Sequence, residues 1–310
     1  MAQYIGRDNS QLVLEFDIKS IVTHPGNAHF DEFMSCCLLL AAGKANRIYR
    51  RRHTDEDLAN PDVLVLDQGG VHDPALSNFD HHQFSADHPA ACTITLVLPI
   101  LGVSTRQARL VWNWLFHAEM VDSKGPYSTA KHYGVSPELL NNMVSPVESS
   151  VIRLFGSRDF ITLEPVNALS MTGYSDFLPQ LMCLIGKDWL DMISKVIGRV
   201  ELLKEEARFY EVEGIPVCDV TSLARGINAS ANLDLFLREV NKLHCAITIT
   251  NDERAGGICL YRRGDDPRIN FAQLEGQPGI RFVHKNGFVC KADTAVGISH
   301  IIKSALTRRR

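Results

Sequence analysis

Two short apolar runs, each followed at once by an ionisable residue, constrain the fold of this chain most strongly. Ile21-Val22-Thr23 is followed by His24, and the run from Asp62 to Leu66 is followed by Asp67. Runs of this kind are typical of strands buried on both faces, which occur in parallel sheets covered by helices. Apolar residues at helical spacing over 31–42 predict a connecting helix. The fold class is therefore predicted to be α/β, starting with a parallel-sheet domain.

The length of 310 residues predicts about two domains, because a single core rarely grows to that size. Residues 1–187 are predicted to form the first domain, with a further strand over 47–50 and mostly helical structure from 90 to 185. Residues 188–213 have apolar side chains at helical spacing and predict a long linker helix. Residues 214–310 contain strand-like runs and a closing helix, which predict a smaller α+β domain.

Composition excludes several classes of protein. Hydrophobic residues make up 45% of the chain and charged residues 22%, which is globular rather than disordered composition. The longest apolar stretches are too short to span a bilayer, and the N-terminus lacks a signal-peptide pattern, so a cytoplasmic protein that does not bind membranes is expected. The eight cysteines are scattered and are expected to be reduced thiols.

The net charge of -4 argues against a strongly basic nucleic-acid binder. A local basic channel or a metal-mediated phosphate site stays open as an alternative.

Histidine and aspartate concentrate in four short segments. Imidazole and carboxylate groups together bind Mn, Zn, Fe or Co, and two such ions about 3.5–4 Å apart can catalyse phosphoryl displacement. Asp67 is a candidate for a carboxylate shared by both ions, because it ends a buried strand and is followed by Gly69-Gly70, which permits a sharp turn. The four segments are His24–Glu32, Asp67–Gly70, Asp80–Gln83 and Asp122–Gly125.

Each segment also has an ordinary structural explanation. Asp31 and Glu32 lie where a helix begins, a position that favours acidic side chains through the helix dipole alone. Asp122 precedes Gly125-Pro126 and fits a turn at a helix end. Four such segments in one chain nevertheless favour a common site.

At these residues the sequence resembles the DHH phosphoesterase superfamily and, within it, the melanocyte-proliferating-gene family of metal-dependent exonucleases. The Asp-His-His motif that names the superfamily stands at Asp80-His81-His82, and the resemblance runs nearly the full length. The family's other motifs are met by Thr23 to Glu32, by Ile48, Arg50 and Arg52, by Asp67 to Pro74, by Phe79 to Gln83, by Val121 to Gly125 and by Phe282 to Phe288.

The resemblance implies a DHH-type catalytic domain, two divalent cations and a role for each motif residue. Mn²⁺ is the expected metal, with Mg²⁺ or Co²⁺ as alternatives. His82 is expected to face the scissile phosphate, and Asp80 to orient a histidine or stiffen the turn. One ion is expected at His24, His29 and Asp67, and the second at Asp31, Asp67, His81 and Asp122.

The resemblance also suggests substrate contacts. Arg50 and Arg52 are expected to project from a strand towards the metal site, where phosphate contact and surface salt bridging both remain open. His284 is expected to help bind substrate in the second domain. Where the family has a glycine pair, this chain has Cys290-Lys291, and Lys291 is expected to supply a point charge.

The function expected on this basis is a metal-dependent phosphodiesterase, a 3′–5′ exonuclease on single-stranded RNA or short oligonucleotides. The alternative is a small-molecule phosphoesterase, such as a pyrophosphatase or a hydrolase of cyclic dinucleotides or nucleoside phosphates. A third hypothesis is a nucleotide sensor that binds without turnover. A homodimer is left open.

Overall fold

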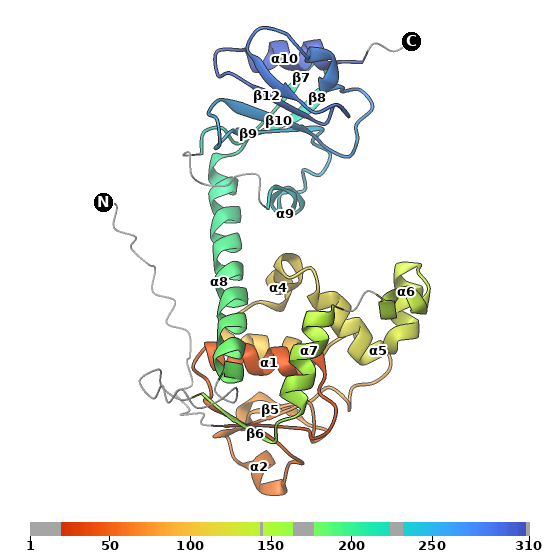
Figure 1. The fold of residues 1–310 in the computed structure, drawn as a ribbon, viewed down its shortest axis with the longest axis vertical. Coiled ribbons are helices and arrows are strands. Elements are labelled where there is room, and N and C mark those ends of the chain that lie inside the picture. Colours follow the sequence, from red (N-terminus) through yellow and green to blue (C-terminus); the bar gives the residue numbers. More distant parts are fainter. Residues whose placement is uncertain (1–19, 143–144, 164–176, 224–231, 308–310) are drawn as a thin grey trace, which may run out of the picture. The chain divides into compact units, whose positions relative to one another are not determined.

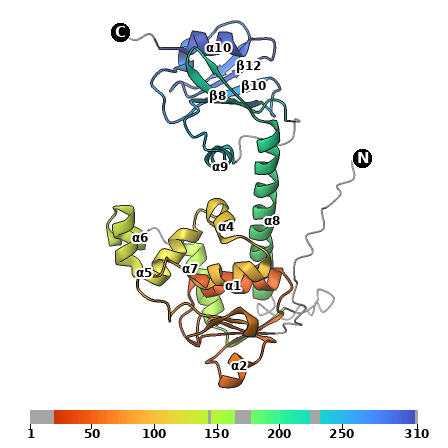
Figure 2. The same ribbon diagram turned by 180° about the vertical axis from the view of Figure 1, so that it is seen from behind.

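The structure, a computed structural model, describes residues 20–142, 145–163, 177–223 and 232–307 (Figures 1 and 2). The chain divides into two compact units, 1–193 and 194–310. The boundary lies within the long helix α8, Phe177–Glu206.

The first unit is built on a six-stranded sheet in the order β4-β5-β3-β1-β2-β6. The central strands β1, β2, β3 and β5 are parallel, so the parallel sheet predicted from the apolar runs is confirmed. The sequence did not reveal the short strands β4, β5 and β6, which extend the sheet at its two edges. The strands are β1 (Ser20–Thr23), β2 (Arg47–Arg50), β3 (Val63–Leu66), β4 (His72–Asp73), β5 (Asn78–Phe79) and β6 (Phe160–Thr162).

Helices cover both faces of this sheet. Helix α1 lies on one side and α2 on the other (Figure 1). Helix α8 approaches α1 closely at Gly186, where a Cβ atom would clash with the Cys37 carbonyl oxygen, so only glycine fits there. The helices of this unit besides α8 are α1 (Phe30–Ala41), α2 (Asp55–Ala59), α3 (Thr93–Val97), α4 (Thr105–Val111), α5 (Leu115–Tyr133), α6 (Pro137–Asn142) and α7 (Pro146–Gly156), with 3-10 turns at Pro74–Leu76 and Leu98–Leu101.

Within the mostly helical stretch predicted from 90 to 185, the helical structure is interrupted between α4 and α5, where the rings of Trp112 and Trp114 stack with centroids 5.5 Å apart. The Trp112 indole nitrogen also donates to the backbone oxygen of Trp189 on α8. Asp122 lies in α5 three residues before Gly125, whose φ of 78° and ψ of 164° break the helix, so the predicted helix-end position of Asp122 is confirmed.

The second unit contains a six-stranded sheet in the order β11-β12-β10-β9-β8-β7, mostly antiparallel, with β8 and β9 parallel. Helix α10 covers one face, where Phe271, Leu274, Ile301 and Ile302 form a buried core with the strands. The elements are β7 (Arg208–Val212), β8 (Ile215–Asp219), α9 (Leu233–Glu239), β9 (Ile247–Asn251), β10 (Ile258–Arg262), a 3-10 turn (Phe271–Leu274), β11 (Ile280–Val283), β12 (Val289–Ala292) and α10 (Ile298–Ala305).

The linker helix predicted over 188–213 has different limits. Helix α8 begins earlier, at Phe177, and ends at Glu206. Residues 208–212 instead form β7, which pairs with β8 across a turn at Glu213 and Gly214, both with positive φ. The prediction extended the helix because single apolar residues at 209, 210 and 212 fit a helical face as well as a strand edge.

All eight cysteines are free thiols, seven of them buried and Cys183 partly exposed. Within the described ranges no single helix is long and apolar enough to cross a membrane. Two consecutive helical segments, Thr93–Leu101 and Thr105–Val111, are long and apolar enough only when they are taken together, and the chain bends by 114° between them.

Candidate metal site

The site lies at the carboxyl ends of two neighbouring parallel strands, where ligands bind in sheets of this type. His24 follows β1 and Asp67 follows β3, and these two strands are paired directly. Asp67 adopts φ +56°, in the left-handed region that aspartate tolerates better than most residues. Gly69 and Gly70 also have positive φ, +98° and +66°, so the chain turns away at once. Because of this turn, the Asp67 carboxylate lies at the carboxyl end of β3.

The first group of side chains meets one oxygen of Asp67. His24 Nε2 lies 3.4 Å from Asp67 Oδ2, and His29 Nδ1 lies 3.9 Å from the same oxygen. The two imidazole rings are 5.1 Å apart. The structure thus brings together the three residues expected to hold one ion.

The second group meets the other oxygen. His81 Nε2 lies 3.3 Å from Asp67 Oδ1 and 2.7 Å from Asp122 Oδ2. Asp31, in the first turn of α1, completes a set in which the ligand atoms of all four residues lie within 4.8 Å of one another. The four residues expected to hold the second ion therefore also converge.

The donor atoms of both groups fit divalent cations. Buried polar atoms normally make hydrogen bonds, and unpartnered ones need an explanation. The unpartnered buried atoms of the structure include His24 Nε2, Asp31 Oδ1, Asp67 Oδ2, His81 Nε2 and Asp122 Oδ2. Imidazole nitrogens and carboxylate oxygens that approach one another without hydrogen-bond geometry are the arrangement expected around ions.

Thr93, which no motif in the sequence indicated, supports the carboxylates of this site. Its backbone N–H donates to Asp31 Oδ2 at 3.2 Å, and its hydroxyl donates to Asp67 Oδ1 at 3.3 Å. The residue is the first of α3, whose amides have no partner within the helix. The only feature of the sequence that could have indicated Thr93 is its position at the start of a helix shortly after the Asp-His-His motif.

Glu32 is the second site residue that the sequence left unassigned. Its carboxylate is fully buried and accepts from the Thr23 hydroxyl at 2.5 Å and from the His29 backbone N–H at 3.0 Å. Glu32 Oε1 also lies 3.3 Å from His24 Nε2. Since all residues from 31 to 40 are buried, an acidic side chain among them required such partners.

The placement of Arg50 corrects both alternatives that the sequence left open for it, phosphate contact and a surface salt bridge. Its side chain is buried and pairs with Glu32 at 3.1 Å. It also donates to the backbone oxygens of Gly26 and Gly156. A buried carboxylate needs a counterion, and Arg50 serves that need. The arginine therefore holds Glu32 and the loop carrying His29 rather than facing substrate.

Asp80 contacts His82 and not His81. Asp80 Oδ1 lies 2.6 Å from His82 Nδ1, and Asp80 Oδ2 accepts from the Gly70 backbone N–H at 2.6 Å. The His82 side chain is 60% exposed, whereas that of His81 is 5% exposed. The two adjacent histidines therefore face different surroundings.

The structure describes the other three expected substrate contacts in their own units. Arg52 is exposed just after β2. His284, in the second unit, lines a cavity of about 610 Å³ together with Phe282 and Lys285, and its ring packs on Phe288. Lys291 lies within β12, paired with strands on both sides, and its ammonium is 3.1 Å from Asp252 Oδ1.

The carboxylates control the ionisation of the histidines. Contact with Asp67 raises the pKa of His24 to about 9 despite partial burial. Burial lowers the pKa of His81, but Asp122 and Asp67 outweigh it and raise that pKa to about 10. Burial, followed by the charges of Asp67 and Asp122, raises the pKa of Asp31 well above its usual range. The clustered carboxylates therefore favour the binding of cations at this site.

Comparison with known protein families gives a match in the N-terminal part of the chain. Residues 20–96 match the family model MYG1_exonuc, described as an uncharacterised protein family (UPF0160). A MYG1 exonuclease from Mus musculus is 42% identical over 64 residues, 20% of this chain and 17% of the relative. A MYG1 protein from Chlamydia pneumoniae is 39% identical over 71 residues, 22% of this chain and 24% of the relative. The matches thus span less than a quarter of either relative.

One solved structure, titled a pGpG-specific phosphodiesterase, PggH, from Vibrio cholerae, aligns over 89% of this chain and 93% of its own chain at 14% identity. Its TM-score of 0.28 is too low to support a shared fold.

Proposed function

We propose that this chain is a metal-dependent phosphodiesterase of the DHH type. One observation carries the proposal: the two oxygens of a single carboxylate face different ligand groups. Asp67 Oδ2 lies towards His24 and His29, and Asp67 Oδ1 lies towards His81. A carboxylate placed in this way is suited to bridge two divalent cations.

Two cations held by these residues would stabilise charge on a phosphoryl group and lower the pKa of an attacking water. The chain's own residues position the rest. Thr93 and the Glu32–Arg50 pair fix the carboxylates and the histidine loop through hydrogen bonds. His82, held by Asp80 through Nδ1, has its other ring nitrogen available to exchange a proton with substrate.

The proposed substrates are single-stranded RNA or short oligonucleotides, degraded from the 3′ end. The match of residues 20–96 supports a nuclease, because it contains His24, His29, Asp31, Asp67 and His81, and one relative is named an exonuclease. The net charge of -4 favours a short substrate over a long polyanion. The same charge also favours a small-molecule phosphoester as the alternative substrate.

The test is hydrolysis by the full chain of end-labelled RNA and DNA oligomers of several lengths, pyrophosphate and cyclic dinucleotides, each with Mn²⁺, Mg²⁺ or EDTA. The proposal predicts metal-dependent shortening of oligomers by one nucleotide at a time from the 3′ end. Hydrolysis of pyrophosphate or cyclic dinucleotides alone would favour the small-molecule alternative. Binding of oligomers with no turnover under any metal would instead indicate a sensor.

A further inference from the structure

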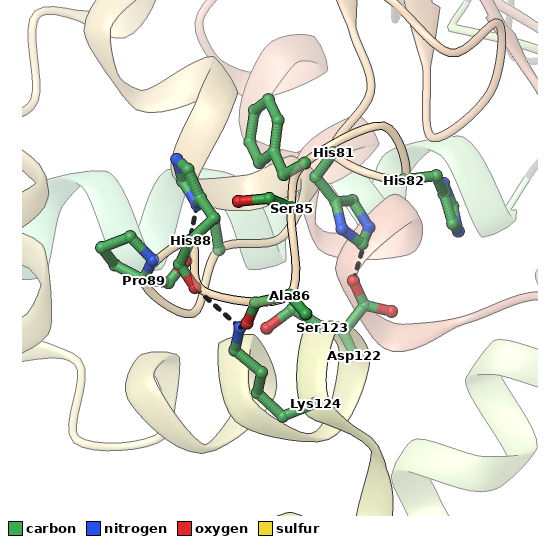
Figure 3. Close-up of a pocket in the computed structure, with 11 residues that line it drawn as sticks. His81, His82, Ser85, Ala86, His88, Pro89, Asp122, Ser123 and Lys124 are labelled. Atoms are coloured by element: carbon green, nitrogen blue, oxygen red, sulfur yellow. Dashed lines mark hydrogen bonds and ion pairs between the residues drawn. The ribbon is translucent and has the colours of Figure 1, made fainter.

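A pocket of about 340 Å³ opens directly beside the metal site. Two of its lining residues, His81 and Asp122, belong to the second metal group, and a third is His82 (Figure 3). The opposite wall is the loop 84–89, which follows the Asp-His-His motif, and the base is the turn of α5 that carries Lys124. A substrate whose phosphodiester lies at the metals would therefore extend into this pocket.

Lys124 gives the pocket a positive charge. Its ammonium donates to the backbone oxygens of Ala86 and His88, each at 2.7 Å. Lysine has three donors, so one N–H remains. In the part of the chain that the structure describes, no carboxylate pairs with Lys124. An ammonium bound only by carbonyl oxygens keeps its full charge for an anion.

The loop holds His88 in place and adds a hydroxyl. His88 Nδ1 lies 2.7 Å from the Pro89 backbone oxygen, so this nitrogen is engaged within the loop. The His88 ring is held against Phe84, with centroids 4.3 Å apart. The Ser85 hydroxyl lines the same pocket (Figure 3). The pocket therefore contains the Lys124 ammonium and the Ser85 hydroxyl, both of which can donate to an anion.

We infer that this pocket binds a terminal phosphate of a short oligonucleotide whose neighbouring phosphodiester lies at the metals, with Lys124 as the charged contact. The inference rests on the proposed function and adds a substrate class to it. A volume of about 340 Å³ is at the small end of ligand pockets and suits one end group rather than a continuing strand. The site would thus select very short substrates that carry an end phosphate.

The test compares three dinucleotides of one sequence, which carry a 5′-phosphate, a 3′-phosphate or no terminal phosphate. For the wild-type chain, kcat/KM for one phosphorylated form should exceed that for the unphosphorylated form by roughly ten- to a hundredfold, the effect of one charge-assisted contact. Lys124→Met should reduce this preference to about twofold or less. Lys131→Met, on the exposed face of the same helix, should leave the preference and the activity unchanged.

Salt dependence supplies a measurement that needs no variant. The favoured dinucleotide should show a steeper loss of affinity with salt than the unphosphorylated one, because salt screens the additional charge contact.

Equal kcat/KM for all three dinucleotides in the wild type would overturn the inference. A Lys124→Met chain that keeps the preference would also overturn it. Equal loss of activity on all three dinucleotides in that variant would do so too, because it would show that Lys124 only stabilises the loop. Failure to hydrolyse any dinucleotide or longer oligomer with any metal would instead refute the proposed function itself.

Discussion

His82 Nδ1 lies 2.6 Å from Asp80 Oδ1, so the carboxylate that begins the Asp-His-His motif orients the second histidine rather than the first. The first, His81, instead has its Nε2 between Asp67 and Asp122. The two rings stack with centroids 4.5 Å apart, yet one side chain is buried and the other exposed. The two adjacent histidines thus contact different carboxylates, and we expect them to have different roles.

Exchanging each histidine for alanine should separate these tasks. His81→Ala removes a proposed metal ligand, so bound metal and turnover should fall together. His82→Ala removes a ring that belongs to neither of the two expected ligand sets and is paired with Asp80, so metal content should stay near that of the wild type while kcat drops by roughly 10²–10⁴-fold. Metal analysis of the purified variants and steady-state kinetics decide the matter. An equal loss of metal in both variants would contradict the assignment, and added Mn²⁺ should rescue His81→Ala more readily than His82→Ala.

Removing the counterion of Glu32 should destabilise the first unit. Arg50→Met leaves a buried carboxylate without its partner, which typically costs about 3–5 kcal/mol of unfolding free energy. Arg52→Met is the matched control, because that side chain is exposed and its loss should change stability by less than about 0.5 kcal/mol. Urea denaturation followed by circular dichroism measures both. Similar stability for the two variants would show that Arg50 is not a structural counterion.

Metal binding should release protons at neutral pH. Without a cation, His24 and His81 have pKa values raised to about 9 and about 10, so both are protonated at pH 7.5. Metal ligation requires neutral imidazole, so roughly two protons should leave per chain as the site fills. Calorimetric titration with Mn²⁺ in buffers of different ionisation enthalpy measures this number. A heat of binding independent of the buffer would contradict it.

The same shifts fix the pH dependence of the metal-free chain. A histidine whose pKa is higher in the folded than in the unfolded state contributes stability that is present below the unfolded value of about 6.5. That contribution is lost as pH rises through about 9 for His24 and about 10 for His81. EDTA-treated protein should therefore melt at progressively lower temperature between pH 7 and 10. A melting temperature that rises over this range would show that the histidines are not paired as described.

Much of the site was predictable because its residues stand next to strong local signals. A buried strand marks the position of the residue that follows it, and His24 and Asp67 were found in this way. Partnerships across the sheet were not predictable in the same manner. The sequence indicates that Arg50 ends a strand. Only the packing of α1 places Glu32 beside it, and Arg50 therefore forms a buried ion pair instead of the phosphate contact or surface salt bridge considered from the sequence.

The fold was predictable to a similar extent. Continuous apolar runs identified β1 and β3, since burial on both faces leaves a clear pattern. Two-residue strands such as β4 carry no periodicity at all. At the break between α4 and α5, Trp112 donates to the backbone oxygen of Trp189, a residue far away in the sequence. Local patterns contain no information on such contacts.

The central claim is that Asp67 is shared by two cations, and replacing it by asparagine tests this most directly. Asparagine keeps the size and tolerates the positive φ of 56°, so only the charge is lost. Asp62→Asn, exposed just before the same strand, is the control. With equal melting temperatures verified, Asp67→Asn should bind clearly fewer than the roughly two Mn²⁺ ions per chain of the wild type, and its turnover should fall by orders of magnitude. Undiminished metal content and full activity in Asp67→Asn would contradict the dinuclear site.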